Sequence, residues 1–273
     1  METTTGIFTK VETPYAPLVI AAVVQTASGV GLSVLAQNFD FRTPIRVHHA
    51  GSGFEVVTTT LPGEISLIYA VVAINLIGVP WPAFFAIARA VKQNTAHTKG
   101  NIWAKIAWNH YASEVHQASN RYRWLEYILC WPLAIMVAAI ALGVNDFFAL
   151  LAHMVLAAAT VVIAYVQDRE AGVLKKDKWF PLASACGVCL CQWILLVWYG
   201  TMHGSTITSW MPGVTLMLAS CALFVMQIMN SRYKQLFGEI HINGDAREIA
   251  LVSISLATKL FFSGFVILFI WEH

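Results

Sequence analysis

One lysine stands in the middle of an otherwise apolar stretch of the sequence. The run "SISLATKLFFSGFVILFI" covers residues 253–270, and Lys259 lies near the centre of the apolar segment that contains it. About 20 apolar residues are enough to cross a lipid bilayer as a helix. A charged amine at that depth costs about 3 kcal/mol on insertion scales, so such a lysine is normally paired, neutralised or used in chemistry. Lys259 is therefore the first candidate functional residue.

Glu126 is the acid best placed to pair with Lys259. It lies within the apolar run that follows "NRYRW", whereas Glu64 and Asp146 stand at the ends of apolar segments. The purely structural alternative is a buried ion pair that joins two helices, and such pairs contribute little to stability. Chemical use of the lysine amine is the other alternative.

Two further groups of residues have the composition of metal ligands. Three of the five cysteines are closely spaced: Cys186, Cys189 and Cys191. No second cluster completes a metal site, so we interpret the cysteines as packing residues. Three histidines and a glutamate lie between the second and third apolar segments: His97, His110, Glu114 and His116. Only His110 and Glu114 would share a helical face. We interpret this segment as polar cytoplasmic surface, and we expect neither a metal-dependent membrane hydrolase nor any other enzyme.

The composition is that of a membrane protein. Hydrophobic residues make up 58% and charged residues 12% of the 273 residues, against about 25% charged residues in soluble proteins. Apolar windows of about 19 residues predict seven spans at 17–36, 65–90, 124–142, 147–166, 179–202, 210–229 and 248–270. We expect residues 1–273 to form one all-α seven-helix domain. The net charge of +2 indicates no nucleic-acid partner.

Basic residues in the loops predict the orientation of the chain. Fourteen of the 17 lysines and arginines lie in segments on the side of the N-terminus, Arg42 and Arg46 lie on the other side, and Lys259 lies within a span. Because positively charged loops stay in the cytoplasm, we expect a cytoplasmic N-terminus and an extracellular C-terminus. In the first outer loop, "FRTPIRVHH" and "FEVVTTT" flank "AGSG". This pattern predicts a small β-hairpin over the outer face.

Lys259 and Glu126 can pair only if they lie at a similar depth in the membrane, and this condition constrains where the third helix begins. Lys259 lies 11 residues after Glu248, which is about 16 Å along a helix. Glu126 lies only three residues after Arg123, so it reaches a comparable depth only if its helix begins earlier, near residues 114–117. We therefore expect "SEVHQASNRYR" to be helical, with polar groups that line a wet cavity in the cytoplasmic half.

The chain resembles a known family. Seven spans, "RWLEY" in the third and "SLATK" in the seventh are similar to microbial-type rhodopsins. The inside N-terminus and the outer-loop hairpin are features of one group among them, the heliorhodopsins. The resemblance covers essentially the whole chain, is strongest at 121–131 and 247–264, and includes "MQIMNSRYKQLFGE". A seven-helix hormone-type receptor, suggested by "NRY", is excluded because that motif precedes the third apolar run and because the N-terminus lies inside.

The resemblance implies a covalent chromophore. Lys259 would form a Schiff base with all-trans retinal, Glu126 would be the counterion of the protonated imine, and Ser255 would lie near that imine. A close anion keeps an imine protonated in an apolar pocket and sets its colour. Six aromatic residues are candidates for the walls of the pocket: Trp124, Tyr127, Trp131, Trp193, Phe224 and Phe261.

The sequence departs from the family at two places. Family members often carry histidines in the first two spans, but "LVIAAVVQTASG" and "LIYAVVAINLIG" contain none. Gln25 and Asn75 could replace part of that polar network. In addition, "EYILCWPL" lacks the small polar residue that usually follows the glutamate–tyrosine pair. We therefore expect an atypical proton route, colour and photocycle.

Two functions remain open at this stage. A pump needs a relay of acids on both sides of the imine, and the outer half has no carboxylate deep in a span because Glu64 and Asp146 are peripheral. We expect a light sensor that signals to an unknown cytoplasmic partner. A light-gated channel for protons or cations, as reported for a few viral members of the family, is the alternative. We also expect a homodimer in the lipid bilayer.

Overall fold

The structure, a computed structural model, describes residues 15–37, 42–50, 56–94, 102–116, 121–170, 180–236 and 244–272. Nine helices lie in this part of the chain: α1 (Ala16–Ala36), α2 (Leu67–Ile77), α3 (Pro80–Asn94), α4 (Ile102–His116), α5 (Arg121–Ala141), α6 (Phe147–Glu170), α7 (Phe180–Met202), α8 (Ile207–Leu236) and α9 (Gly244–Glu272). Two strands, β1 (Arg42–Ala50) and β2 (Val56–Ser66), follow α1.

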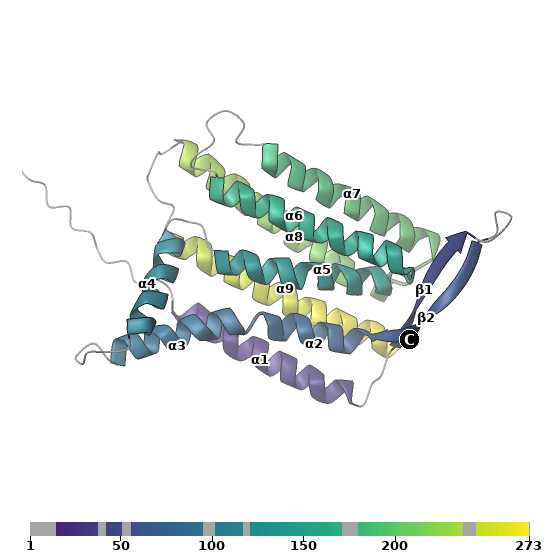
Figure 1. The fold of residues 1–273 in the computed structure, drawn as a ribbon, viewed down its shortest axis with the longest axis horizontal. Helices are drawn as coiled ribbons and strands as arrows, with labels where there is room; N and C mark the ends of the chain where they lie inside the picture. Colours follow the sequence, from purple (N-terminus) through teal and green to yellow (C-terminus); the bar gives the residue numbers. More distant parts are fainter. Residues whose placement is uncertain are drawn as a thin grey trace, which may run out of the picture.

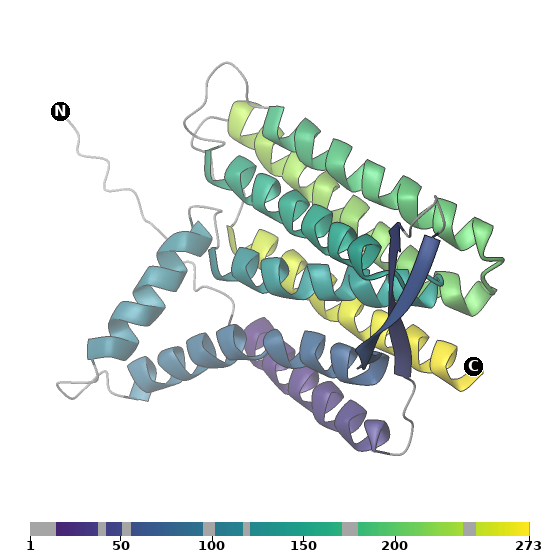
Figure 2. The same cartoon turned by 45° about the vertical axis from the view of Figure 1, so that its right-hand side comes forward.

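The predicted bundle of seven membrane spans is confirmed. Seven helices of the described chain are long and apolar enough to cross a membrane: Ala16–Ala36, Leu67–Gln93, Arg121–Ala141, Phe147–Asp168, Phe180–Met202, Ile207–Met229 and Arg247–Glu272. These helices lie side by side, with α4 across one end and the two strands at the other (Figures 1 and 2). We call the first the charged end, because α5 and α9 begin there with arginines and acids, and the second the hairpin end.

The second span is divided into α2 and α3. Pro80, the first residue of α3, has no N–H group and cannot continue the hydrogen-bonding pattern of α2. The N–H groups of Gly78 and Val79 instead donate to the carbonyls of Asn75 and Leu76, at 3.2 and 3.1 Å. These tighter bonds bend the span near its middle.

The predicted β-hairpin is confirmed. β1 and β2 pair antiparallel from Arg42 opposite Ser66 to Ala50 opposite Val56. The backbone N–H of Arg46 donates to the carbonyl of Asn145 at 2.8 Å, and this bond fixes the hairpin to the turn between α5 and α6. The chain crosses from α1 to α2 through this hairpin at the end opposite α4 (Figure 2).

One prediction about the third span is wrong. The helix was expected to begin near residues 114–117, but α5 begins at Arg121, and the preceding helix α4 ends at His116. Glu114 supplies the physical reason. One of its carboxylate oxygens accepts the backbone N–H of Arg121 at 2.9 Å, and the other lies 2.6 Å from Nε of Arg121. A carboxylate that pairs with a free N–H group stabilises a new helix N-terminus.

An aromatic cluster holds α4 against the bundle. Its buried members are Leu18, Phe85, Ala88, Trp108, Tyr111 and Val115. The rings of Phe85 and Tyr111 stack with 4.4 Å between their centroids. The interpretation of this segment as polar surface holds for His110, which is exposed, and is wrong for Glu114, which is buried. His97 and the side chain of His116 lie outside the described residues.

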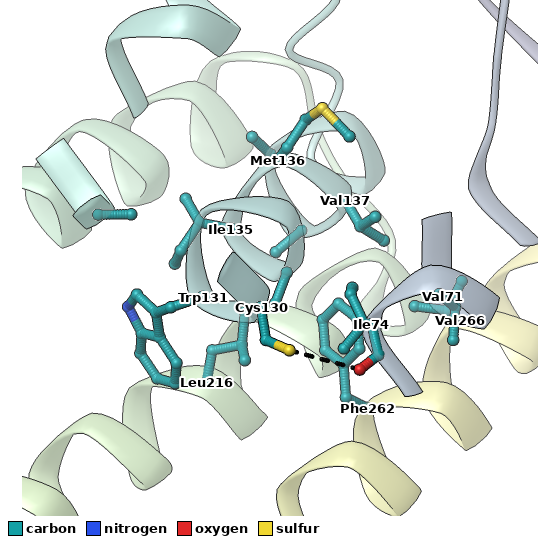
Figure 3. Packing of buried hydrophobic residues seen from close by; sticks show 14 of the residues in the cluster. Val71, Ile74, Cys130, Trp131, Ile135, Met136, Val137, Leu216, Phe262 and Val266 are labelled. Carbon is teal, nitrogen blue, oxygen red and sulfur yellow. Dashed lines mark hydrogen bonds between the residues drawn. The ribbon is translucent and has the colours of Figure 1, made fainter. Parts of the chain in front are cut away.

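Helix α5 lies at the centre of the core. Within the described spans, 72% of the α5 window is buried, against 28–44% for the other six. Figure 3 shows Trp131, Ile135 and Val137 of α5 packed among side chains of α2, α8 and α9. The packing interpretation of the cysteines is confirmed for Cys130 and Cys189, which are buried. The two that lie on the bundle surface are Cys191 and Cys221.

Candidate functional site

Lys259 and Glu126 meet inside the bundle. Nζ of Lys259 lies 2.5 Å from Oε1 of Glu126, and the two residues are 6% and 0% exposed. Ser255, one turn earlier on α9, donates its hydroxyl to the same carboxylate oxygen at 3.1 Å. The structure therefore brings together the three residues for which the sequence predicted a role at the reactive nitrogen.

The long lysine side chain bridges the difference in depth between the two residues. Side chains on a helix lean toward the N-terminus of that helix, and the N-terminus of α9 lies at the charged end (Figure 1). Lys259 therefore reaches back toward Glu126, which lies five residues after the start of α5. An earlier start of the third helix is not needed.

Glu126 also binds a second cation. Its other carboxylate oxygen lies 2.5 Å from Nη1 of Arg123, whose Nη2 lies 3.1 Å from Oε1 of Glu248. The Tyr111 hydroxyl donates to that same oxygen of Glu248 at 3.1 Å. Two cations and two anions are thus buried together, and each charge has an opposite partner, as burial requires. This network connects α4, α5 and α9.

This network is not predicted from the sequence. Hydropathy places Arg123 in the connection before the third span and Glu248 at the start of the seventh, although both are buried in the structure. One signal was present, because Arg123 and Glu126 are three residues apart and share a helical face. The pairing of Glu248 with Arg123 needed the positions of two helices, which no local pattern supplies.

A second buried ion pair lies at the charged end. Oδ1 of Asp168, on α6, lies 2.6 Å from Nη2 of Arg247 on α9. Oδ2 of Asp168 accepts the indole N–H of Trp124 at 2.8 Å. A buried tryptophan N–H normally finds such a partner. The triad joins α5, α6 and α9, and it too was missed, since Asp168 follows the apolar window predicted for the fourth span.

The cavity in the half of the bundle near the charged end is lined by different residues from those predicted. A small cavity beside Arg123 and Glu126 is lined otherwise by aromatic and apolar side chains: Leu18, Trp81, Pro82, Phe85, Tyr111 and Tyr122. Of the described residues in the stretch expected to line it, Tyr122 and Arg123 do so. Among the described residues, the aromatic cluster under α4 supplies most of this wall, and Arg123 and Glu126 supply its charged part.

Gly78 lies against the lysine amine. A β-carbon added to Gly78 would collide with Nζ of Lys259 and would lie 2.5 Å from Oε1 of Gln25. Gln25 and Asn75 are both buried, at 1% and 0% exposure, and their side-chain oxygens have no hydrogen-bond partner among the described residues. The side-chain N–H of Asn75 donates to Ser263 at 3.0 Å. The two amides named from the sequence thus lie close to Lys259.

Replacing Gly78 with alanine should disturb the site. The added methyl group would overpack the space around Nζ of Lys259, and overpacking costs about 1–3 kcal/mol. We expect a lower melting temperature of the purified protein and slower uptake of an aldehyde by Lys259. Gly264→Ala is the matched control, because no described atom beyond its chain neighbours and its own helix backbone lies within 4 Å of the added carbon. Equal melting temperatures and uptake rates for both variants would contradict the proposed crowding.

A cavity opens directly beside Lys259. It is bounded by α2, α5, α8 and α9, and its lining is apolar apart from Ser255, Thr258 and Lys259. A second cavity is bounded by α5, α6, α7 and α8. The two cavities adjoin, because both are lined by Tyr127, Trp131 and Leu223. Together they extend from Lys259 toward α6 and α7.

The predicted aromatic residues lie in three different environments. Tyr127 and Trp131 line both cavities, and Trp124 and Phe224 line the second. Trp193 is partly buried against the core and lines neither of them.

One aromatic candidate was wrong and its neighbour was missed. Phe261 is 63% exposed, whereas Phe262 is 1% exposed and lines the first cavity. Residues 255, 259, 262 and 266 repeat at intervals of three and four, so helical periodicity could have identified Phe262.

Comparison with known families identifies a family for the chain. The family model described as Heliorhodopsin matches residues 17–259, which is most of the chain. A search of curated proteins finds no match. The matched region contains the pair of Glu126 and Lys259, the whole lining of the second cavity and, except for Phe262, the lining of the first. The chain therefore belongs to the heliorhodopsin family, whose members are retinal-binding membrane rhodopsins of the photoreceptor type.

Proposed function

We propose that Lys259 carries all-trans retinal as a Schiff base and that Glu126 is its counterion. The observation that supports this most is the 2.5 Å contact between Nζ of Lys259 and the carboxylate of Glu126 at the end of an apolar cavity. A primary amine at that position suits an aldehyde on a long apolar chain, because the chain enters apolar space and the nitrogen keeps an anion beside it.

The residues around Lys259 would orient the counterion and hold the chain of the chromophore. Ser255 and Arg123 each bond one oxygen of Glu126, and so hold its carboxylate in one orientation. Tyr127, Trp131 and Leu223 would hold the chain of the chromophore where the two cavities adjoin. Retinal, when bound, supplies the absorption of visible light and the change of shape that follows.

We further propose that the N-terminus and the charged end lie in the cytoplasm. The support is the excess of lysine and arginine in the loops on that side, which keeps such loops cytoplasmic. A homodimer is also part of the proposal, and the exposed apolar surface of the spans would carry it within the bilayer.

Photosensing is the function that the charge distribution favours. Buried carboxylates of the described chain gather from the level of Lys259 to the charged end: Glu114, Glu126, Asp168 and Glu248. Toward the hairpin end, the described residues include no buried carboxylate; the core there contains apolar residues such as Val71, Ile135 and Val266 (Figure 3) and one buried histidine, His153. A pump needs acids on both sides of the nitrogen, and a channel needs a polar path. Motion of the chromophore would instead reach the charged network and, through Tyr111, helix α4.

Electrical recording tests this proposal. Cells that express the protein and contain retinal should give no photocurrent at any voltage, while the purified protein absorbs in the visible. Photocurrents that reverse with voltage would establish the alternative, a light-gated channel for protons or cations. Current in one direction without a driving force would establish a pump.

A further inference from the structure

The second cavity has polar groups in its walls although it lies away from Lys259. Thr160 of α6 and Ser220 and Gln227 of α8 line it, and each is 5–6% exposed. The rest of the lining is apolar or aromatic apart from Cys189. Lys259 lines the first of these two cavities and not the second. The three polar side chains of the second cavity are therefore separate from the pair of Lys259 and Glu126.

The hydroxyl groups in this wall are available only as acceptors. Thr160 donates its hydroxyl to the carbonyl of Leu156 at 2.9 Å, and Ser220 donates to the carbonyl of Leu216 at 2.8 Å. Each hydroxyl proton is therefore used within its own helix, and lone pairs remain on both oxygens.

The side chain of Gln227 indicates more strongly that the cavity holds a ligand with a hydrogen-bond donor. Its side-chain carbonyl oxygen is buried and has no hydrogen-bond partner among the residues that the structure describes. Buried carbonyl oxygens are nearly always hydrogen-bonded. A group that donates a hydrogen bond from inside the cavity would satisfy it.

We propose that the second cavity is a subsite for a hydroxyl group on the ring of the chromophore, so that a hydroxylated retinal is preferred to retinal itself. The inference rests on the proposed function, because attachment at Lys259 leaves the far end of the ligand to enter the adjoining cavity. A ring hydroxyl donates to Oε1 of Gln227, and the oxygens of Thr160 and Ser220 are further acceptors in the same wall. A ketone on the ring can only accept hydrogen bonds, so it cannot bond to these oxygens. A ketone-bearing retinal should therefore not be preferred to retinal.

Competition between retinoids tests the subsite. Retinal-free protein is mixed with equal amounts of all-trans retinal and all-trans 3-hydroxyretinal, and the bound retinoids are extracted and separated. One neutral hydrogen bond corresponds to an enrichment of the hydroxylated form of about 3- to 10-fold. 4-Oxoretinal in place of the hydroxylated form should show no enrichment. Equal uptake of retinal and 3-hydroxyretinal would overturn the subsite and leave the proposed function intact. Failure to bind either retinoid would overturn both.

A glutamine variant supplies a second test that needs no bound retinoid. Gln227→Met should remove the enrichment, and it should raise the melting temperature of the retinal-free protein because it removes an unpartnered buried carbonyl. Gln192→Met is the matched control, since Gln192 is buried on α7, donates to the carbonyl of His153 at 2.7 Å and lines neither cavity. The control should keep the enrichment and should lower the melting temperature. Enrichment that persists in Gln227→Met would overturn the assignment.

Discussion

Lys259→Ala should abolish the visible absorption band that forms when all-trans retinal is added to the purified protein. In the proposed function, the amine of Lys259 beside the apolar cavity is the nucleophile, and without it no covalent bond to the aldehyde should form there. The fold should survive the change, because Arg123 still lies 2.5 Å from the carboxylate of Glu126. The measurement is an absorption spectrum before and after retinal is added.

Lys105→Ala is the control for this variant. Lys105 is exposed on α4, so its loss should leave the visible band unchanged. A Lys259→Ala protein that still forms a covalent visible pigment would remove the basis of the proposed function.

Glu126→Gln should change the colour of the pigment at neutral pH. The substitution replaces the anion beside the nitrogen with a neutral amide, while the Arg123 guanidinium stays close by. The band should move to the red if the nitrogen keeps its proton, or to the near ultraviolet if it loses the proton. Both results follow from loss of the negative charge that stabilised the protonated nitrogen.

Glu248→Gln is the matched control for the counterion. Glu248 is also buried and also bonds Arg123, but the amine of Lys259 lies against Glu126, while Glu248 bonds Tyr111 and Arg123. Its spectrum should shift much less than that of Glu126→Gln. An unchanged spectrum in Glu126→Gln would mean that another acid, Glu64 or Asp146, serves as the counterion. Asp146 is far less suited to that role, because it accepts the N–H of Ala149 at the start of α6.

The parts of the fold that could be predicted depend on local patterns. Hydropathy gave the seven spans, because a span needs a continuous run of apolar residues whatever its neighbours are. The turn in "AGSG" and the flanking β-branched residues indicated the hairpin in the same way. The pair of Lys259 and Glu126 could be predicted because charged residues within membrane spans are few. With one lysine and one acid deep in the predicted spans, each was the obvious partner of the other.

The parts that could not be predicted depend on contacts between distant segments. The start of α5 at Arg121 is stabilised by Glu114 of the preceding helix, which sequence periodicity alone does not show. Arg123, Asp168 and Glu248 read as residues at the ends of spans, and only the packing of α4, α6 and α9 around α5 buries them. Hydropathy also treats adjacent aromatic residues alike, so it did not separate exposed Phe261 from buried Phe262.

Chemical reduction followed by peptide mapping tests the central claim most directly. Borohydride converts a Schiff base to a stable amine, so the retinal-loaded protein can be reduced, digested and examined by mass spectrometry. We predict that the retinyl group is found on the peptide that contains Lys259 and on no other lysine. A retinyl group on a different lysine, or retinal that is lost from the protein after reduction, would contradict the account.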